Sequence, residues 1–471
     1  MEHAGLTELK LIDRPDPAAL AMEAEIRLRG STLYDINGSL NVSELSYKEG
    51  DRTIKSASIL LDAEGDEIRD YSLRSDFLDL DLSGLIVTSE LPGAIRSIAA
   101  RYLPALLELE SRRQKPQDFT LFARFKNTLA ITELFFPSVT IAPMTELSGK
   151  FRTETGDVAL QLKSSELLVS GARLDRVRLS SESQGDAFKF NATVGSIGIT
   201  DSVRLNAFSM NGYTSRDTAE ATVDFSGLDS SRSDVRFGML AGFQQDGLTA
   251  LRVRTEQLLL GGREWTLDPE NRVLIDTTGM EFHDFVLRSG IQELAFSGFL
   301  SAQPESVFSI SFAEFESAQL NPYLSEYEVN IGGVVHGQAA FSGLLTRPAM
   351  DADINVRYLR WYGDTLGDAD VVCEWDDQRK EIAIEAAVTR GGQQNIELIG
   401  AYRFLEPEDR IDFNVELKKT YLNAFSHYLD GIFSGLGGVA SGKLALKGPV
   451  SAPELSGKLY LQKVGFTVDY T

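Results

Sequence analysis

Cysteine, histidine and long apolar runs are all scarce in this chain. Its 471 residues include one cysteine, Cys373, and four histidines. A single thiol excludes an intramolecular disulfide framework and any metal site built from several cysteines. No run of about 18 apolar residues occurs, so no segment predicts a transmembrane helix.

The two ends of the sequence suggest an excerpt from a longer chain. The start, from Met1 to Ala4, lacks the basic and apolar regions of a secretory signal peptide. The other end, from Phe466 to Thr471, alternates like a strand and stops without a closing turn. We therefore expect the chain to be an internal fragment of a longer protein.

Positive charge is also in short supply. The chain has 46 Lys and Arg against 69 Asp and Glu, which gives a net charge of −23. Such a charge argues against nucleic acid as a partner, because its phosphates would be repelled. It also disfavours lying flat on an anionic bilayer, although contact through one end stays open. The hydrophobic content of 43% excludes a disordered chain.

No motif typical of an active site is present. The histidines have no metal-ligand spacing; they are His3, His283, His336 and His427. Asp79 and Asp81 alternate with leucines, so they belong to the wet face of a strand rather than to a catalytic pair. Cys373 shares a strand face with Val371 and Trp375, which indicates a packed apolar role. We expect no catalytic residue, no metal and no cofactor, and predict a protein that is not an enzyme.

Alternation with a period of two dominates the sequence. From Arg410 to Lys418, every second residue is apolar and the others are polar. This pattern is typical of a strand with one apolar and one solvated face. It predicts a set of residues that share an apolar face: Leu160, Leu162, Ile354, Val356, Tyr358, Ile382, Ile384, Ile411, Phe413, Val415, Leu417, Leu444, Leu446, Leu459 and Leu461.

Many of these alternating segments begin or end at a residue pair that contains glycine. Asn37-Gly38, Asp246-Gly247 and Ser456-Gly457 are pairs that tight reversals favour. The sequence therefore predicts an all-β protein. We expect an elongated antiparallel sheet that curls around a hydrophobic groove, with a few short amphipathic helices, because strands with one apolar face must close, curl or be covered in water.

Three segments interrupt the strand pattern. Apolar residues between Pro92 and about Arg113 recur at helical spacing, and Pro104 should kink or split that helix. This helix is either a lid over the groove or a cover for an exposed sheet edge. Shorter helices are expected at about 320–327 and 422–429.

A spaced signature occurs twice near the C-terminal end. The copies align without a gap at an offset of 105 residues (437 minus 332), and a similar Leu-Asn pair precedes each, at Leu320 and Leu422. The copies are Gly332, Gly333, Val334, Gly337, Gly343, Pro348 and Gly437, Gly438, Val439, Gly442, Gly448, Pro453. These positions indicate a duplicated structural unit whose glycines serve turns and bulges.

Four segments follow from these patterns, with no linker-like composition between them. We expect a sheet segment at 1–91, a helical insertion at 92–115, a second sheet segment at 116–319 and a tandem-repeat segment at 320–471 that leads into a further C-terminal domain. One continuous sheet explains the absence of linkers better than separate compact domains.

Two motifs carry a resemblance to a known family. The second repeat copy, with Leu444, Leu446, Leu455, Gly457 and Leu459 after its glycines, resembles the recurrent repeat of the TamB family of AsmA-like, bridge-forming lipid transfer proteins. The stretch from Trp265 through Leu267 and Pro269 to Asn271, followed by Phe285 to Gly298, resembles the central segment of these proteins, particularly in Bacteroidetes-type versions. The likeness covers roughly 260–471.

The resemblance implies a location and a role. TamB-like proteins (translocation and assembly module) span the periplasm of Gram-negative bacteria from an N-terminal inner-membrane anchor. They form a taco-shaped β groove, and are implicated in carrying phospholipids to the outer membrane and in outer-membrane protein assembly and secretion with a BamA- or TamA-type barrel. For this chain the implied partners are phospholipids, that barrel and the inner membrane, with no nucleic acid.

Other interpretations stay open at this point. The same residues fit the core of a closed barrel or sandwich. The sheet could instead act as a scaffold that holds outer-membrane strands during assembly. An extracellular β-solenoid would require regular coils of about 20 to 30 residues.

Overall fold

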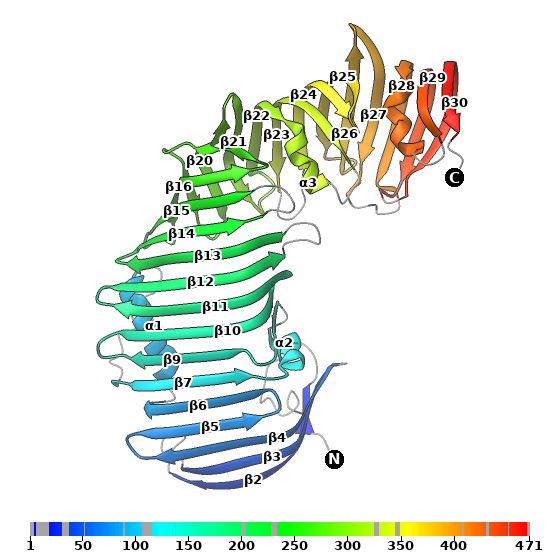
Figure 1. The fold of residues 1–471 in the computed structure, drawn as a ribbon. Helices are drawn as coiled ribbons and strands as arrows, with labels where there is room; N and C mark the ends of the chain where they lie inside the picture. The colour runs from blue at the N-terminus through cyan, green and yellow to red at the C-terminus, as the bar shows by residue number, and fades with distance from the viewer. Residues whose placement is uncertain are drawn as a thin grey trace. The chain divides into compact units, whose positions relative to one another are not determined.

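The protein is all-β. The computed structural model describes residues 4–5, 18–30, 37–50, 52–87, 90–105, 115–136, 138–198, 204–227, 233–324, 329–343, 349–404, 406, 409–429, 433–450 and 452–468. The strands in these ranges belong to a long antiparallel sheet, with few and short helices (Figure 1). The predicted antiparallel class is therefore confirmed, and the β-solenoid alternative is wrong because solenoid coils stack their strands in parallel.

The chain divides into two compact units, Met1–Thr249 and Ala250–Thr471. The boundary falls inside the sheet segment expected at 116–319. In unit 1 most strands pair antiparallel with the next strand in the chain; the exception is the three-residue strand Val139–Ile141, which pairs with Asp157–Val169 and is skipped by its two sequence neighbours. Its elements are β1 (Ala4–Gly5), β2 (Ala18–Arg29), β3 (Asn37–Glu49), β4 (Arg52–Gly65), β5 (Arg69–Ser75), β6 (Leu78–Leu85), α1 (Leu91–Tyr102), β7 (Asp118–Phe125), α2 (Leu129–Phe135), β8 (Val139–Ile141), β9 (Glu146–Arg152), β10 (Asp157–Val169), β11 (Ala172–Gln184), β12 (Ala187–Gly198), β13 (Arg204–Ser215), β14 (Thr218–Ser226) and β15 (Asp234–Phe243).

From Gly279 onward, unit 2 also consists of sequential antiparallel pairs, while the short strands Thr266–Leu267 and Arg272–Ile275 both pair with Gly279–Ser289. Its elements are β16 (Thr249–Leu260), whose first residue belongs to unit 1, β17 (Arg263–Glu264), β18 (Thr266–Leu267), β19 (Arg272–Ile275), β20 (Gly279–Ser289), β21 (Gln292–Ser301), β22 (Val307–Glu316), η2 (Ser317–Leu320), α3 (Asn321–Leu324), β23 (Ile331–Ser342), β24 (Ala349–Trp361), β25 (Asp364–Asp376), β26 (Glu381–Arg390), β27 (Gln393–Tyr402), β28 (Ile411–Tyr421), η5 (Leu422–Leu429), β29 (Phe433–Gly448) and β30 (Glu454–Val468).

Only one of the three predicted glycine turns is a turn. Asp246-Gly247 closes the reversal after β15, where the Gln244 N–H donates to Leu248 O at 2.9 Å. The other two predictions are wrong, because Gly38 lies inside β3 opposite Leu28 and Gly457 lies inside β30 opposite Leu444. Both glycines have a φ in the left-handed range, at +132° and +146°. Their missing side chain permits a close approach of backbones within the sheet rather than a reversal.

The predicted helix at 92–113 is shorter than expected. Helix α1 ends at Tyr102, and Leu103 adopts a non-helical φ of −134° and ψ of 60°. Pro104 therefore ends the helix instead of kinking it, because a proline disfavours helical geometry in the residue before it. Residues 106–114 lie outside the described part of the chain.

The other helices also differ in detail from the expectation. A 3₁₀ turn and one α-helical turn, η2 and α3, occupy Ser317–Leu324, while 325–328 lies outside the described residues. The 3₁₀ helix η5 covers 422–429 as predicted. Helix α2 in unit 1 was not anticipated, because its seven residues are too few for a helical period to stand out.

The 105-residue offset extends well beyond the glycine signature. The extra residue of a β-bulge on β22 lies between Phe312 and Phe315, and that on β28 lies between Leu417 and Thr420. Each bulge contains a residue with left-handed φ, at Glu314 (+49°) and at Lys419 (+50°), which are 105 residues apart.

A second pair of bulge residues repeats at the same distance. Tyr358 has a φ of +54° and Lys463 a φ of +53°. The helical inserts begin at Ser317 and Leu422, again 105 residues apart. The Leu-Asn pairs noted in the sequence are 102 residues apart and do not occupy equivalent places. The duplicated unit therefore includes strands, bulges and a helical insert.

Candidate functional site: an apolar sheet face

One row of apolar side chains crosses unit 1 from strand to strand. Each member lies directly opposite the next in the antiparallel register, so the row runs perpendicular to the strands on a single face. The row consists of Ile26, Leu40, Leu61, Leu73, Leu80, Ala123, Leu147, Leu162, Leu179, Ala192, Met210, Val223 and Phe237. We call this set the unit 1 apolar row.

Most of the larger side chains of this row are not enclosed in a core, whereas Val223 and the two alanines are buried. Ile26 is 61% exposed and Leu179 is 41% exposed, while Leu80, Leu147 and Leu162 are half-buried. A second layer of protein would bury such residues almost completely. Over much of the row, the described part of unit 1 therefore leaves the apolar face accessible.

Helix α1 covers one margin of this face. Its Ile98 and Tyr102 pack in a buried cluster with Phe119, Phe151 and Val158, which share the face of the apolar row. The Tyr102 hydroxyl donates a hydrogen bond to Gly156 O at 3.0 Å. The interpretation of α1 as a cover for a strand edge is wrong, because the helix lies against the apolar face itself.

An equivalent row crosses unit 2. It consists of Leu287, Leu294, Phe312, Gly337, Ile354, Val371, Ala386, Leu398, Val415 and Leu444. Every side chain in this unit 2 apolar row except glycine is half-buried. The two units thus present the same surface, a one-sided apolar sheet face.

The residues predicted to share an apolar face fall on these two rows or beside them. Leu162, Ile354, Val415 and Leu444 are row members. The neighbours two or four residues away on the same face are Leu160, Val356, Ile382, Ile384, Ile411, Phe413, Leu417 and Leu446. Leu459 and Leu461 lie on the next strand, β30, opposite Gly442 and Ala440. Ile382, Ile411 and Leu417 are buried, whereas Leu459 and Leu461 on β30 are 40% and 55% exposed.

Tyr358 departs from the pattern. It occupies the extra position of the β24 bulge, is 67% exposed, and its backbone N–H donates to Asp368 Oδ1 at 2.8 Å. A bulge interrupts the alternation of faces, and no period-two pattern in one strand reveals it.

The ends of the repeat signature lie at the ends of strands: Gly343 follows β23, Gly448 ends β29 and Pro453 precedes β30. Pro348 lies outside the described residues.

The Trp265 to Asn271 stretch connects neighbouring strands through buried side-chain contacts. Trp265 is 5% exposed and packs with Phe315 and Val335. The Asn271 side chain is fully buried. Its Nδ2 donates to Val253 O at 2.6 Å and to Asp268 O at 2.5 Å, and its Oδ1 accepts the Val253 N–H at 2.9 Å. The amide therefore replaces ladder hydrogen bonds beside β16.

The titratable residues noted in the sequence do not converge. His283 lies near Glu281 and His336 near Glu314, while the ring of His427 stacks on Tyr362. His3 lies outside the described residues. Asp81 pairs with Arg74 at 2.6 Å and Asp79 with Lys126 at 2.7 Å. Within the described chain, no group of three or more His, Cys, Asp or Glu side chains is arranged to hold a metal ion.

The buried thiol of Cys373 gives a first prediction. Cys373 is 6% exposed, and burial, with a smaller effect of the Asp351 charge, raises the pKa of its thiol. Because the thiolate is the reactive form, we expect an aromatic disulfide reagent at pH 8 to modify it about 100-fold more slowly than in the unfolded chain. The rate in guanidinium chloride provides the reference, and equal rates in both states would contradict the burial.

Comparison with protein-family models, with curated proteins and with solved structures finds no match for this chain. In the ranges that the structure describes, no helix combines the length and the apolar character that crossing a membrane requires.

Proposed function

We propose that this chain binds phospholipids by their acyl chains along the apolar sheet face and conducts them between two membranes. The observation that carries the proposal is the pair of in-register apolar rows, which cross the strands of each unit and whose larger side chains, except the buried Val223, stay at least partly exposed. A barrel or sandwich would enclose such residues in a packed interior, so the half-exposure favours a surface over a core.

The physics of acyl transfer fits this surface. Each methylene of an acyl chain that leaves water gains about 0.8 kcal/mol. A carrier therefore needs an apolar path without polar interruption, and a row that continues from strand to strand supplies one. The polar head group can stay in solvent, so the path needs no specific polar ligand. A catalytic site is equally unnecessary, and the proposed role is not enzymatic.

The wider setting rests on the repeat and Trp265–Asn271 motifs, which resemble the TamB family. On that basis we place the protein in the periplasm of a Gram-negative bacterium, within a bridge that is anchored in the inner membrane and supports outer-membrane biogenesis with a BamA-type barrel. The duplicated structural unit of β22 to β24 and β28 to β30 supports a repeat-built bridge.

The test is native mass spectrometry of the purified chain, combined with lipid extraction. We expect co-purified phospholipid, and at least a ten-fold loss of it in the double variant Phe413→Glu, Val415→Glu, because a charge on the row interrupts the apolar path. The control is Asn414→Glu, which adds a charge to the same strand on the opposite, exposed face. Circular dichroism establishes that each variant is folded.

Two results would contradict the proposal. The first is a wild-type chain that carries no phospholipid after purification from membranes. The second is a folded double variant that retains as much lipid as Asn414→Glu, since the apolar row would then be irrelevant to binding.

A second candidate function has one observation in its favour. All residues of β30 are exposed, and its only partner among the described strands is β29. An open strand edge can accept another strand, as a scaffold for outer-membrane barrel assembly would require. Photo-crosslinks from β30 to an unfolded barrel segment, without bound phospholipid, would favour this function over the first.

A further inference from the structure

A second row crosses the polar face of unit 1 and consists mostly of charged residues. It consists of Arg74, Asp79, Arg124, Glu146, Lys163, Arg178, Thr193, Ser209, Asp224 and Arg236. From Arg74 to Lys163, basic and acidic residues alternate, as expected where opposite charges face each other across strands. The alternation breaks at Lys163 and Arg178, two cations directly opposite each other. Both side chains are exposed, and like charges directly opposite each other repel.

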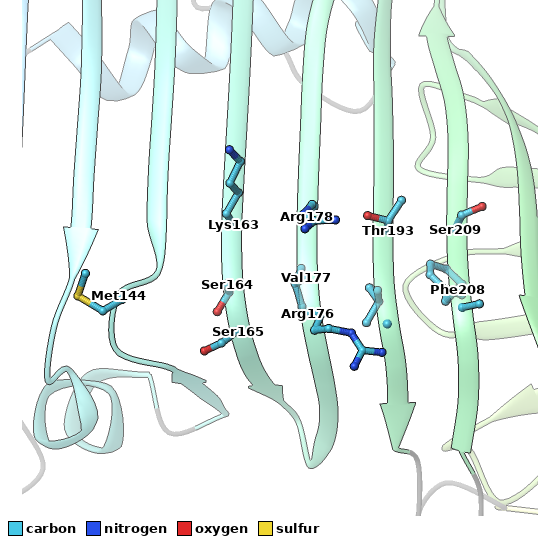
Figure 2. A pocket seen from close by; sticks show the side chains of 13 residues that line it. Met144, Lys163, Ser164, Ser165, Arg176, Val177, Arg178, Thr193, Phe208 and Ser209 are labelled. Carbon is cyan, nitrogen blue, oxygen red and sulfur yellow. The ribbon is translucent and has the colours of Figure 1, made fainter.

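A hollow of about 570 Å³ opens at this break (Figure 2). Lys163 on β10 and Arg178 on β11 line it together with a third cation, Arg176. Thr193 and Ser209 on the next two strands line it as well, together with apolar residues such as Val177, Val194 and Phe208. The hollow thus combines three cations with hydroxyl donors in a chain whose net charge is −23.

The carboxylates around the hollow are engaged elsewhere. Glu146, which faces Lys163 from β9, binds Arg124 at 2.8 Å. Asp224 binds Arg236, and Asp175 accepts hydrogen bonds from Ser196 at 2.8 Å and from Arg173. The Ser196 hydroxyl, more than Arg173, lowers the pKa of the Asp175 carboxyl.

The three cations themselves lack an acidic partner. In the described part of unit 1, no carboxylate lies within ion-pair distance of Lys163, Arg176 or Arg178. Among the described residues of this unit, their charges are therefore not neutralised by an ion pair.

A glycine makes room for one of these cations. Arg176 has a left-handed φ of +53°, and its guanidinium lies against Gly195 on β12. A Cβ at position 195 would come within 2.5 Å of Arg176 Nη2. The missing side chain at position 195 therefore leaves space for the guanidinium beside the hollow.

We propose that this hollow is a phosphate-binding site. Arginine presents a planar pair of donors that matches phosphate oxygens, lysine adds a point charge, and the two hydroxyls complete a donor set without a competing carboxylate. The phosphate group would relieve the repulsion between Lys163 and Arg178. Lys163, Arg178, Thr193 and Ser209 alternate with members of the apolar row along their strands, so these side chains lie on the opposite face from the proposed lipid path.

The test is isothermal titration calorimetry of the full chain with inorganic pyrophosphate. We expect binding that falls at least ten-fold in the double variant Arg176→Gln, Arg178→Gln. The matched control is Lys189→Gln, an exposed cation on β12 outside the hollow, which should bind as the wild type does. Gly195→Ala keeps every charge but displaces the Arg176 guanidinium, and we expect it to weaken binding several-fold.

Vesicle flotation identifies the source of the phosphate. Capture by phosphatidylglycerol vesicles but not by phosphatidylcholine vesicles, with loss in the double variant, assigns the site to an anionic lipid head group. Pyrophosphate binding without vesicle capture assigns it to soluble phosphate compounds. The site is overturned if pyrophosphate does not bind, or if Lys189→Gln weakens binding as much as the double variant, because the effect would then be one of overall charge.

Discussion

Replacement of Asn271 by alanine is expected to destabilise unit 2 by about 3 kcal/mol. The side chain is fully buried and makes hydrogen bonds at both of its polar atoms. Alanine would leave the Val253 N–H and C=O without these partners, whereas the Asp268 C=O would keep the backbone N–H of residue 271 at 3.1 Å. Each unsatisfied buried group costs about 1 to 3 kcal/mol. At about 2 to 4 °C per kcal/mol for a domain of this size, the expected loss in Tm is on the order of 10 °C.

Thermal and urea unfolding, followed by tryptophan fluorescence and circular dichroism, measure this effect. The buried Trp265 reports on the same region. Asn355→Ala is the matched control. The Asn355 amide donates to Asp370 Oδ1 at 2.8 Å in an exposed setting. Its replacement should therefore lower the free energy of unfolding by less than about 1 kcal/mol. Equal stability losses in the two variants would show that the buried Asn271 hydrogen bonds do not contribute more to stability than an exposed one.

A second large loss of stability is expected when Gly442 of the repeat signature is replaced by alanine, but not when Gly437 is. Gly442 has a φ of +154°, and a Cβ there would lie 2.1 Å from Lys458 O. Gly442→Ala would force β29 and β30 apart, and we expect a loss of about 3 kcal/mol or more. At Gly437 the nearest atoms to an added Cβ lie 3.9 Å away and φ is not left-handed. Gly437→Ala should therefore change the stability by less than about 0.5 kcal/mol.

The duplicated unit provides a further control for this prediction. Gly337 is equivalent to Gly442 at the 105-residue offset, has a φ of +120°, and places an added Cβ 2.0 Å from Asp353 O. Gly337→Ala should match Gly442→Ala in its shift of the guanidinium unfolding midpoint. Hydrogen exchange on the amides of the paired strands would localise each effect. A tolerated Gly442→Ala, or an equally damaging Gly437→Ala, would contradict the assignment of these glycines.

The apolar face was predictable because its signal is local. In the segments Val158 to Leu162 and Ile411 to Leu417, apolar and polar residues alternate, and this alternation identifies the two faces of the strand. The pattern can be recognised without knowing which strands lie beside it. The helix after Pro92 was visible for the same reason, since its period of 3.6 lies within one segment. Its end at Tyr102 was not, because a proline in a helical pattern permits either a kink or a stop.

The roles of individual glycines could not be predicted from the same local information. Gly38 and Gly457 look like turn residues in the sequence but lie within strands. Whether a glycine reverses the chain or admits a neighbouring backbone depends on the strand opposite it. The bulge that displaces Tyr358 likewise exists only through its pairing with β25.

The sequence by itself determined the fold class, the apolar candidates and the 105-residue repeat, because each is a periodicity along one chain. Only the tertiary structure decided which residues are opposite one another. Register turned separate alternating strands into the unit 1 and unit 2 apolar rows, and it placed Lys163 against Arg178. The physical reason is that cross-strand pairing joins residues that are distant in sequence, so the surfaces that could bind lipid or phosphate form only when the strands align.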